Sequence, residues 1–173
     1  MRLLQCAGVA AVALTAAPAT LSAAAFIENH SAWTVMGRDD SCLVTTSAVD
    51  GSGAKLTLVH LPDRAFATID SMDWTEVPGR WEDGAGNVEI AVGAAAAPVS
   101  LAARIDGVAI LFTDESGTAF SDLEAALAAV SGDVAEGQPD LAIRDGAGTP
   151  IAVFSLLGAA EAVAKGANCA EAL

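Results

Sequence analysis

Short apolar runs separated by turn residues constrain the fold of this chain more than any other feature of its sequence. Between positions 33 and 70, four such runs are separated by clusters of Gly, Asp and Pro, which is typical of consecutive antiparallel strands. The four runs are Trp33–Met36, Cys42–Ser47, Lys55–His60 and Arg64–Asp70. Because neighbouring runs are joined by only a few residues, we expect them to form a meander.

The same pattern returns after position 87, where further runs are separated by turn residues. These runs are Val88–Val92, Val99–Ile105, Val108–Thr113, Asp140–Arg144 and Pro150–Phe154. The pair Asp106-Gly107 stands between two of them and is typical of a two-residue hairpin turn. We therefore predict a hairpin centred on this pair.

Two stretches of the second half carry helical rather than strand periodicity. Apolar residues recur at helical spacing after Ser121, which stands three residues before Glu124 as in a capping box. A second helix is predicted over about Leu156–Lys165, with Ser155 as its N-cap and Gly166 just beyond its end. Together the patterns predict an α+β domain of mostly antiparallel β-structure, a sandwich or barrel-like sheet with two helices in the C-terminal half.

The first 25 residues have the composition of a secretory signal peptide. Arg2 precedes the apolar run Leu3–Ala17, and a small-residue site follows, so cleavage is expected after Ala25. The run is too short to span a bilayer, and no long apolar run follows it. We expect a single domain over 26–173, located in the periplasm or secreted, with no stable membrane span after cleavage.

Cleavage at that site leaves two cysteines, Cys42 and Cys169. In an oxidising compartment they are expected to form a disulfide that links the two ends of the domain. Chain entropy then favours the folded state by about 5 kcal/mol. A reactive or metal-binding pair is the alternative, but the pair lacks the close spacing of a CxxC motif.

The charge balance restricts the class of partner. Asp and Glu number 22 against 8 Lys and Arg, a net charge of −14, while 53% of the residues are hydrophobic. Nucleic acids and anionic membrane surfaces require clustered Lys and Arg, so neither is an expected partner. The oligomeric state does not follow from the sequence.

Residues that bind metals are sparse. His30 and His60 are thirty positions apart, and we expect both at the surface, with His60 on the polar side of its strand. Asp50, Asp83 and Asp145 each begin an Asp-Gly-x-Gly loop, which has carboxylate and carbonyl ligands for calcium. Because these loops lack the further acidic ligands of an EF-hand, hairpin turns are the preferred interpretation, and we predict no metal and no cofactor.

Aromatic residues mark one possible partner-binding surface. Trp74 and Trp81 bracket a Pro78-Gly79 bend, and two aromatic side chains beside a bend are able to present a face to a peptide or sugar. Packing against the sheet is the alternative role for both tryptophans.

Several features resemble the invasion-associated locus B family of small secreted or periplasmic proteins of Gram-negative bacteria. They are the signal peptide, the early strand Trp33-Thr34-Val35, the nearby Cys42 and the segment Phe154–Ala160 that runs into a helix. In that family the Trp-x-Val strand ends at a Cys, whereas Gly37 stands near this place here. The resemblance implies an envelope or host-interaction protein without catalytic residues.

Two function classes follow. The first is a non-enzymatic periplasmic or secreted module that binds a protein or envelope partner, and for it we predict no catalytic residue. The alternative is a periplasmic hydrolase that uses acidic loop residues such as Asp39, Asp40 or Asp114 as acid and base.

Overall fold

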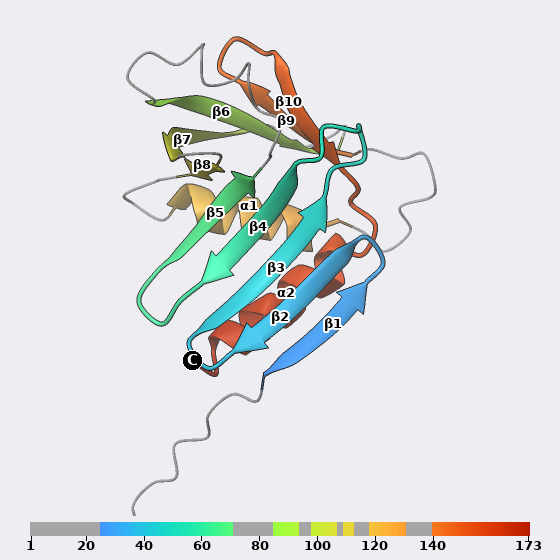
Figure 1. The fold of residues 1–173 in the computed structure, drawn as a ribbon, viewed down its shortest axis with the longest axis vertical. Coiled ribbons are helices and arrows are strands. Elements are labelled where there is room, and N and C mark those ends of the chain that lie inside the picture. The colour runs from blue at the N-terminus through green and yellow to red at the C-terminus, as the bar shows by residue number, and fades with distance from the viewer. Residues whose placement is uncertain (1–24, 71–84, 94–97, 107–108, 113–117, 131–139) are drawn as a thin grey trace, which may run out of the picture.

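The computed structural model describes residues 25–70, 85–93, 98–106, 109–112, 118–130 and 140–173. It contains ten strands and two helices within these ranges (Figure 1). The strands are β1 (Phe26–His30), β2 (Trp33–Arg38), β3 (Ser41–Ser47), β4 (Lys55–His60), β5 (Ala65–Asp70), β6 (Ala85–Val92), β7 (Val99–Asp106), β8 (Ala109–Phe112), β9 (Leu141–Asp145) and β10 (Pro150–Phe154). The helices are α1 (Thr118–Ala128) and α2 (Ala159–Ala170).

All strand pairs are antiparallel, in the order β1-β2-β3-β4-β5-β8-β7-β6-β9-β10. The four predicted strands, β2–β5, form the expected meander, and β1 extends it. Strands β7 and β8 pair as a hairpin, as predicted, but Asp106 belongs to β7 and pairs with Ala109, so residues 107–108 connect the strands in place of the predicted Asp106-Gly107. The fold class is therefore confirmed, although the sheet is not a closed barrel. Figure 1 shows β1–β5 on one side of the molecule, with β6–β10 at one end of these strands and both helices behind them.

The first strand, β1, was not predicted. Its five residues follow the expected cleavage site directly and precede Trp33, where the first predicted strand begins. In β1, Phe26, Glu28 and His30 are partly buried, while Ile27 and Asn29 are exposed. This alternation in burial is that of a strand with one face toward the rest of the protein. The sequence Phe-Ile-Glu-Asn-His does not itself alternate between apolar and polar residues, so it gave no period-two signal.

Both helices were predicted, but their starts and ends differ from the prediction. Helix α1 begins at Thr118, so Ser121 lies inside the helix and is not its N-cap. Helix α2 begins after Gly158, whose φ is 84°, and Gly166 lies inside it rather than beyond its end. A Cβ at Gly166 would overlap the Val44 side chain of β3, so packing against the sheet places glycine here. In the described part of the chain, neither helix is long and apolar enough to cross a membrane.

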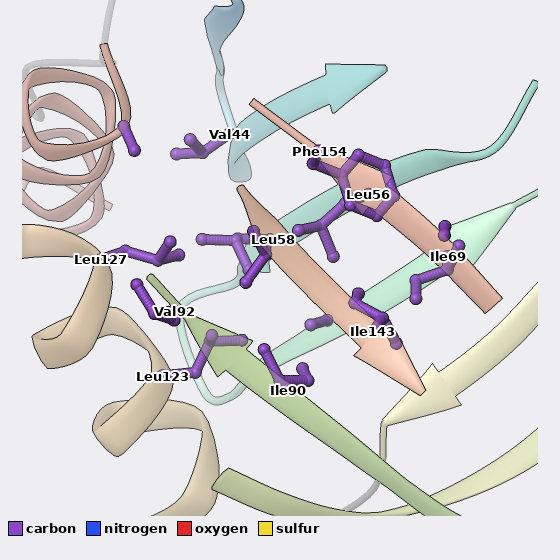
Figure 2. Close-up of a cluster of buried hydrophobic side chains, with 14 of the residues drawn as sticks. Val44, Leu56, Leu58, Ile69, Ile90, Val92, Leu123, Leu127, Ile143 and Phe154 are labelled. Carbon is purple, nitrogen blue, oxygen red and sulfur yellow. The ribbon is translucent and has the colours of Figure 1, made fainter. Parts of the chain in front are cut away.

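The core lies between the helices and the two halves of the sheet (Figure 2). Leu58 of β4 points toward Leu127 of α1, and Leu56 of the same strand lies beside Phe154 of β10. We call the side of β1–β5 that meets the helices the inner face. At its edge the indole N–H of Trp33, which is fully buried, donates a hydrogen bond to the carbonyl oxygen of Ser155 (2.8 Å).

The predicted disulfide is present. Cys42 of β3 and Cys169 of α2 are bonded with a Cα–Cα distance of 6.0 Å, within the usual range for disulfides. The bond joins residues 127 positions apart and ties the last turn of α2 to the inner face.

Candidate binding surface

The aromatic surface proposed from the sequence lies outside the described residues. Trp74, Pro78 and Trp81 belong to the stretch 71–84, and so does Asp83, which begins one of the three Asp-Gly-x-Gly loops. Asp114 is likewise outside the described ranges. The roles assigned to these residues stay predictions.

Two of the acidic residues considered for hydrolysis lie in the turn between β2 and β3. Asp39 and Asp40 are both exposed, and the hydroxyl of Ser41 donates to Asp40 Oδ1 (3.2 Å). A glycoside hydrolase requires two carboxyl groups that face each other across a cleft. Adjacent residues of an exposed turn do not provide that geometry.

The described Asp-Gly-x-Gly loops use their carboxylates to hold turns. Asp145 Oδ1 accepts hydrogen bonds from the N–H groups of Ala147 (3.0 Å) and Thr149 (2.7 Å), and Gly148 has a φ of 82°. These contacts agree with the hairpin interpretation. Within the described ranges, no three His, Cys, Asp or Glu side chains lie close enough together to hold a metal ion.

His60 is buried, and the prediction that it lies at the surface was wrong. It is only 7% exposed and points from β4 to the inner face, where its Nε2 is 3.0 Å from Glu124 Oε1 of α1. Phe120 of the same helix meets the imidazole edge to face, with 5.5 Å between ring centroids. Side chains alternate along a strand, so His60 lies on the same side of β4 as Leu56 and Leu58. The alternation therefore already predicts that His60 is buried.

His30, also expected at the surface, is only partly exposed. Its Nε2 lies 3.8 Å from Glu28 Oε2 on the same strand. The carbonyl oxygen of His30 is close to Gly158, so a Cβ at that glycine would overlap it. His30 therefore helps to hold the turn between β1 and β2 against the start of α2.

The face of β1–β5 opposite the helices carries an apolar row that crosses all five strands. The row runs Ile27–Met36–Leu43–Val59–Phe66, and each residue is the cross-strand partner of the next. We call this side the outer face and this row the apolar ladder. Ile27 is 70% exposed and the other four are partly exposed. Both described helices contact the inner face, so neither of them covers the apolar ladder.

A second row on the outer face consists of hydroxyl and amide side chains. Asn29, Thr34, Thr45, Thr57 and Thr68 are cross-strand partners in that order. The Thr34 hydroxyl donates to Asn29 Oδ1 (2.9 Å), and the hydroxyls of Thr45 and Thr57 are 3.3 Å apart. This threonine ladder lies beside the apolar ladder, so the middle of the outer face carries no formal charge.

Charged side chains stand at the ends of the strands on this face. The guanidinium carbon of Arg64 lies 5.8 Å from the centroid of the Phe66 ring, and Arg38 ends β2. At the opposite ends, Lys55 and Asp70 are cross-strand partners. A neutral centre with charges at its ends differs from the strongly acidic average of the chain.

The edge strand β10 is covered by the segment that follows β3. Ala48 forms a bridge with Phe154, the Val49 N–H donates to the carbonyl oxygen of Val153 (2.8 Å), and the Val153 N–H donates to Asp50 Oδ2 (2.9 Å). Asp50 thus uses its side chain to occupy a backbone donor at this edge. Covering an edge in this way prevents pairing with another chain.

Asp50→Asn is expected to destabilise the protein at neutral pH and to have no such effect in acid. Burial raises the pKa of the Asp50 carboxyl, but hydrogen bonds from the hydroxyl and N–H of Ser52 and from the N–H of Val153 lower it overall, below its ordinary 3.8. An amide has one acceptor where Asp50 uses two oxygens, so we expect a loss of about 1 kcal/mol at pH 7.

The pH dependence of this loss follows from the lowered pKa. The folded-state pKa lies below the unfolded one, so the carboxylate stabilises the fold above the ordinary pKa and ceases to do so as the pH falls through the folded-state value. Urea unfolding at several pH values, with Asp63→Asn as an exposed control, measures the difference. A deficit that persists unchanged in acid would contradict the assigned role.

The other edge strand, β1, is held firmly but its edge is open in the described structure. Lys165 of α2 lies 2.9 Å from Glu28 Oε1 and 5.0 Å from the centroid of the Phe26 ring. The ring rests on Gly37, where a Cβ would overlap it. On the side of β1 away from β2, no described strand pairs with it.

Neither ladder was predicted from the sequence, and nor was the open edge, although the alternation within the predicted strands carried part of the signal. In each predicted strand, one set of alternate residues is less buried than the other, and this set includes Met36, Leu43, Val59 and Phe66. Their alignment across strands depends on register, which the loop lengths alone did not fix.

No family model, curated protein or solved structure matches this chain.

Proposed function

We propose that this protein is a non-enzymatic periplasmic or secreted module that binds a partner protein of the cell envelope through the outer face of β1–β5. The observation that carries the proposal is the apolar ladder, five apolar side chains in register on a sheet face that the helices leave uncovered. Contiguous apolar surface on a folded domain is typical of interaction sites.

The chemistry of the outer face favours a protein partner. The apolar ladder provides area for burial, while the threonine ladder offers hydroxyl groups that both donate and accept hydrogen bonds. The net charge of −14 repels acidic proteins. Because the centre of the outer face carries no formal charge, an acidic partner meets less repulsion there than at the rest of the surface.

The location is part of the same proposal. Residues 1–25 are proposed to be a cleaved signal peptide, and the disulfide between Cys42 and Cys169 is compatible with an oxidising compartment. The resemblance to the invasion-associated locus B family supports the same class of envelope protein.

The proposal is tested with the oxidised protein of residues 26–173 as bait in periplasmic and envelope extracts. Met36→Glu and Val59→Glu each place a charge in the apolar ladder, and we expect either to weaken capture of a stoichiometric protein at least tenfold. Val49→Glu is the matched control, because Val49 is also exposed (57%) but lies outside the outer face.

Three results would argue against the proposal. They are equal capture by the ladder variants and the control, capture of a non-protein envelope component in place of a protein, and substrate turnover that a single substitution abolishes. Thermal unfolding of each variant separates loss of binding from loss of fold.

A further inference from the structure

An open cavity lies at each end of β1. The first has a volume of about 450 Å³ and is bounded by Phe26, Ile27 and Met36, where β1 begins. The second has a volume of about 310 Å³ and is bounded by His30 and Leu157, where β1 ends. An unpaired strand edge with side-chain pockets beside it is the arrangement by which proteins bind an extended peptide as an added strand.

We propose that β1 accepts an extended segment of the partner protein as an additional antiparallel strand. This inference rests on the proposed function, because it states how the partner of the outer face is held. Ile27 connects the two surfaces, since it is both the first residue of the apolar ladder and a member of the open edge.

The register of the β1–β2 hairpin identifies the backbone groups that would be used. His30 pairs with Trp33 across a two-residue turn, which makes this a hydrogen-bonded pair. Hydrogen bonds to β2 then recur at every second residue, at Glu28 and Phe26. Ile27 and Asn29 therefore direct their N–H and C=O groups away from β2, toward an incoming strand.

The edge is already in its binding conformation. Ala32 in the β1–β2 turn donates to the carbonyl oxygen of Leu157 (3.2 Å), which fixes one end of β1 to the start of α2. The contacts of Lys165 with Glu28 and Phe26 fix the other part of the strand. A strand held in this way loses little conformational entropy when a partner pairs with it.

The structure and charge of the chain define the occupant. Only an extended backbone matches the alternating donors and acceptors of Ile27 and Asn29, and the apolar side chains around the first cavity favour an apolar residue there. Arg38 bounds the first cavity and Lys165 pairs with Glu28, so the charges beside the edge balance locally, and it is the net charge of −14 over the whole chain that attracts a segment with Lys or Arg at its ends. A second copy is less favourable, because both chains carry this charge and self-pairing centred on Glu28 would place two carboxylates opposite each other.

The probe for the test is an eight-residue peptide of alternating Val and Thr with a Lys at each end. A second peptide of the same sequence carries N-methyl groups on the backbone amides that would face β1. In NMR titrations of the oxidised protein, the Ile27 and Asn29 amides are expected to exchange rapidly with solvent when free. The first peptide is expected to shift their signals and slow their exchange at least tenfold, and the N-methylated peptide to have no effect.

Substitutions in β1 complete the test. Ile27→Pro and Asn29→Pro each remove an outward N–H without removing a bond to β2, and we expect each to weaken peptide binding at least tenfold. Val49→Ala changes an exposed residue that lies outside both the outer face and β1, and it is expected to bind as the unmodified protein does. Retained thermal unfolding temperatures show that the proline variants are folded.

The outcomes distinguish this inference from the proposed function. Equal binding of the N-methylated peptide, full binding by both proline variants, or unperturbed Ile27 and Asn29 signals would overturn strand addition. If partner capture is lost in Met36→Glu but kept in Ile27→Pro, strand addition is wrong while the proposed function stands. A concentration-dependent dimer that Ile27→Pro abolishes would instead assign the edge to a second copy.

Discussion

Replacing both Cys42 and Cys169 by Ser is expected to lower the free energy of unfolding by about 3–5 kcal/mol. The disulfide closes a loop of 127 residues, and the chain-entropy contribution of a closed loop grows with its length. At about 2–4 °C per kcal/mol, the unfolding temperature should fall by roughly 10 °C. Urea unfolding of the oxidised protein and the double variant measures the difference.

Reduction supplies the control for this prediction. Unmodified protein unfolded in the presence of a reductant should lose the same chain-entropy contribution, because it also lacks the covalent link. The double variant should be no more stable than the reduced protein, because it places hydroxyl groups where the thiols are buried. A double variant as stable as the oxidised protein would mean that the link adds no stability beyond the packing of α2.

The disulfide also bears on the proposed binding surface. It ties the last turn of α2 to β3, and Lys165 one turn earlier in the same helix contacts Glu28 of β1. Loosening the end of α2 is therefore expected to loosen the hold on β1. If strand addition is correct, peptide binding in the double variant should weaken even at temperatures where the variant is folded.

The fold was predictable from the sequence to the extent that local pattern determines it. The strand Lys55–His60 was predicted with its observed bounds, because alternation and flanking turn residues agree there. The exposure of its last residue was predicted wrongly. Histidine is a polar residue, but His60 lies on the same side of β4 as Leu58 and is buried with it. Glu124 of α1 provides a partner for its imidazole that no local sequence pattern reveals.

Helix ends were less predictable because tertiary contacts set them. Ser155 was expected to cap α2, but its hydroxyl instead accepts a hydrogen bond from the Leu157 N–H (3.2 Å), within the turn before the helix. The helix begins only after Gly158, where the chain passes close to His30. The open edge and the ladders depend on register and on which faces the helices cover, and both arise only when the whole chain is assembled.

Gly158→Ala is expected to be more destabilising than any other glycine-to-alanine change at a positive φ in the described turns. Gly158 has a φ of 84°, and alanine in this conformation costs about 1–2 kcal/mol. Its Cβ would also overlap the carbonyl oxygen of His30, a backbone atom that moves only if the β1–β2 turn moves. Such overpacking adds about 1–3 kcal/mol.

Gly51→Ala is the matched control for this substitution. Gly51 has a nearly identical φ of 81°, but apart from its own residue and its two chain neighbours no atom lies within 4 Å of the position of its Cβ. Gly51→Ala should therefore lower the free energy of unfolding only by the conformational cost of alanine at a positive φ. The difference in unfolding free energy between the two variants, measured in urea, gives the cost of the overlap with His30. Equal losses would mean that the turn shifts at no cost. In that case the close contact at Gly158 would not fix the end of β1, and the rigid edge on which strand addition depends would have to rest on the Ala32–Leu157 hydrogen bond and on the contacts of Lys165.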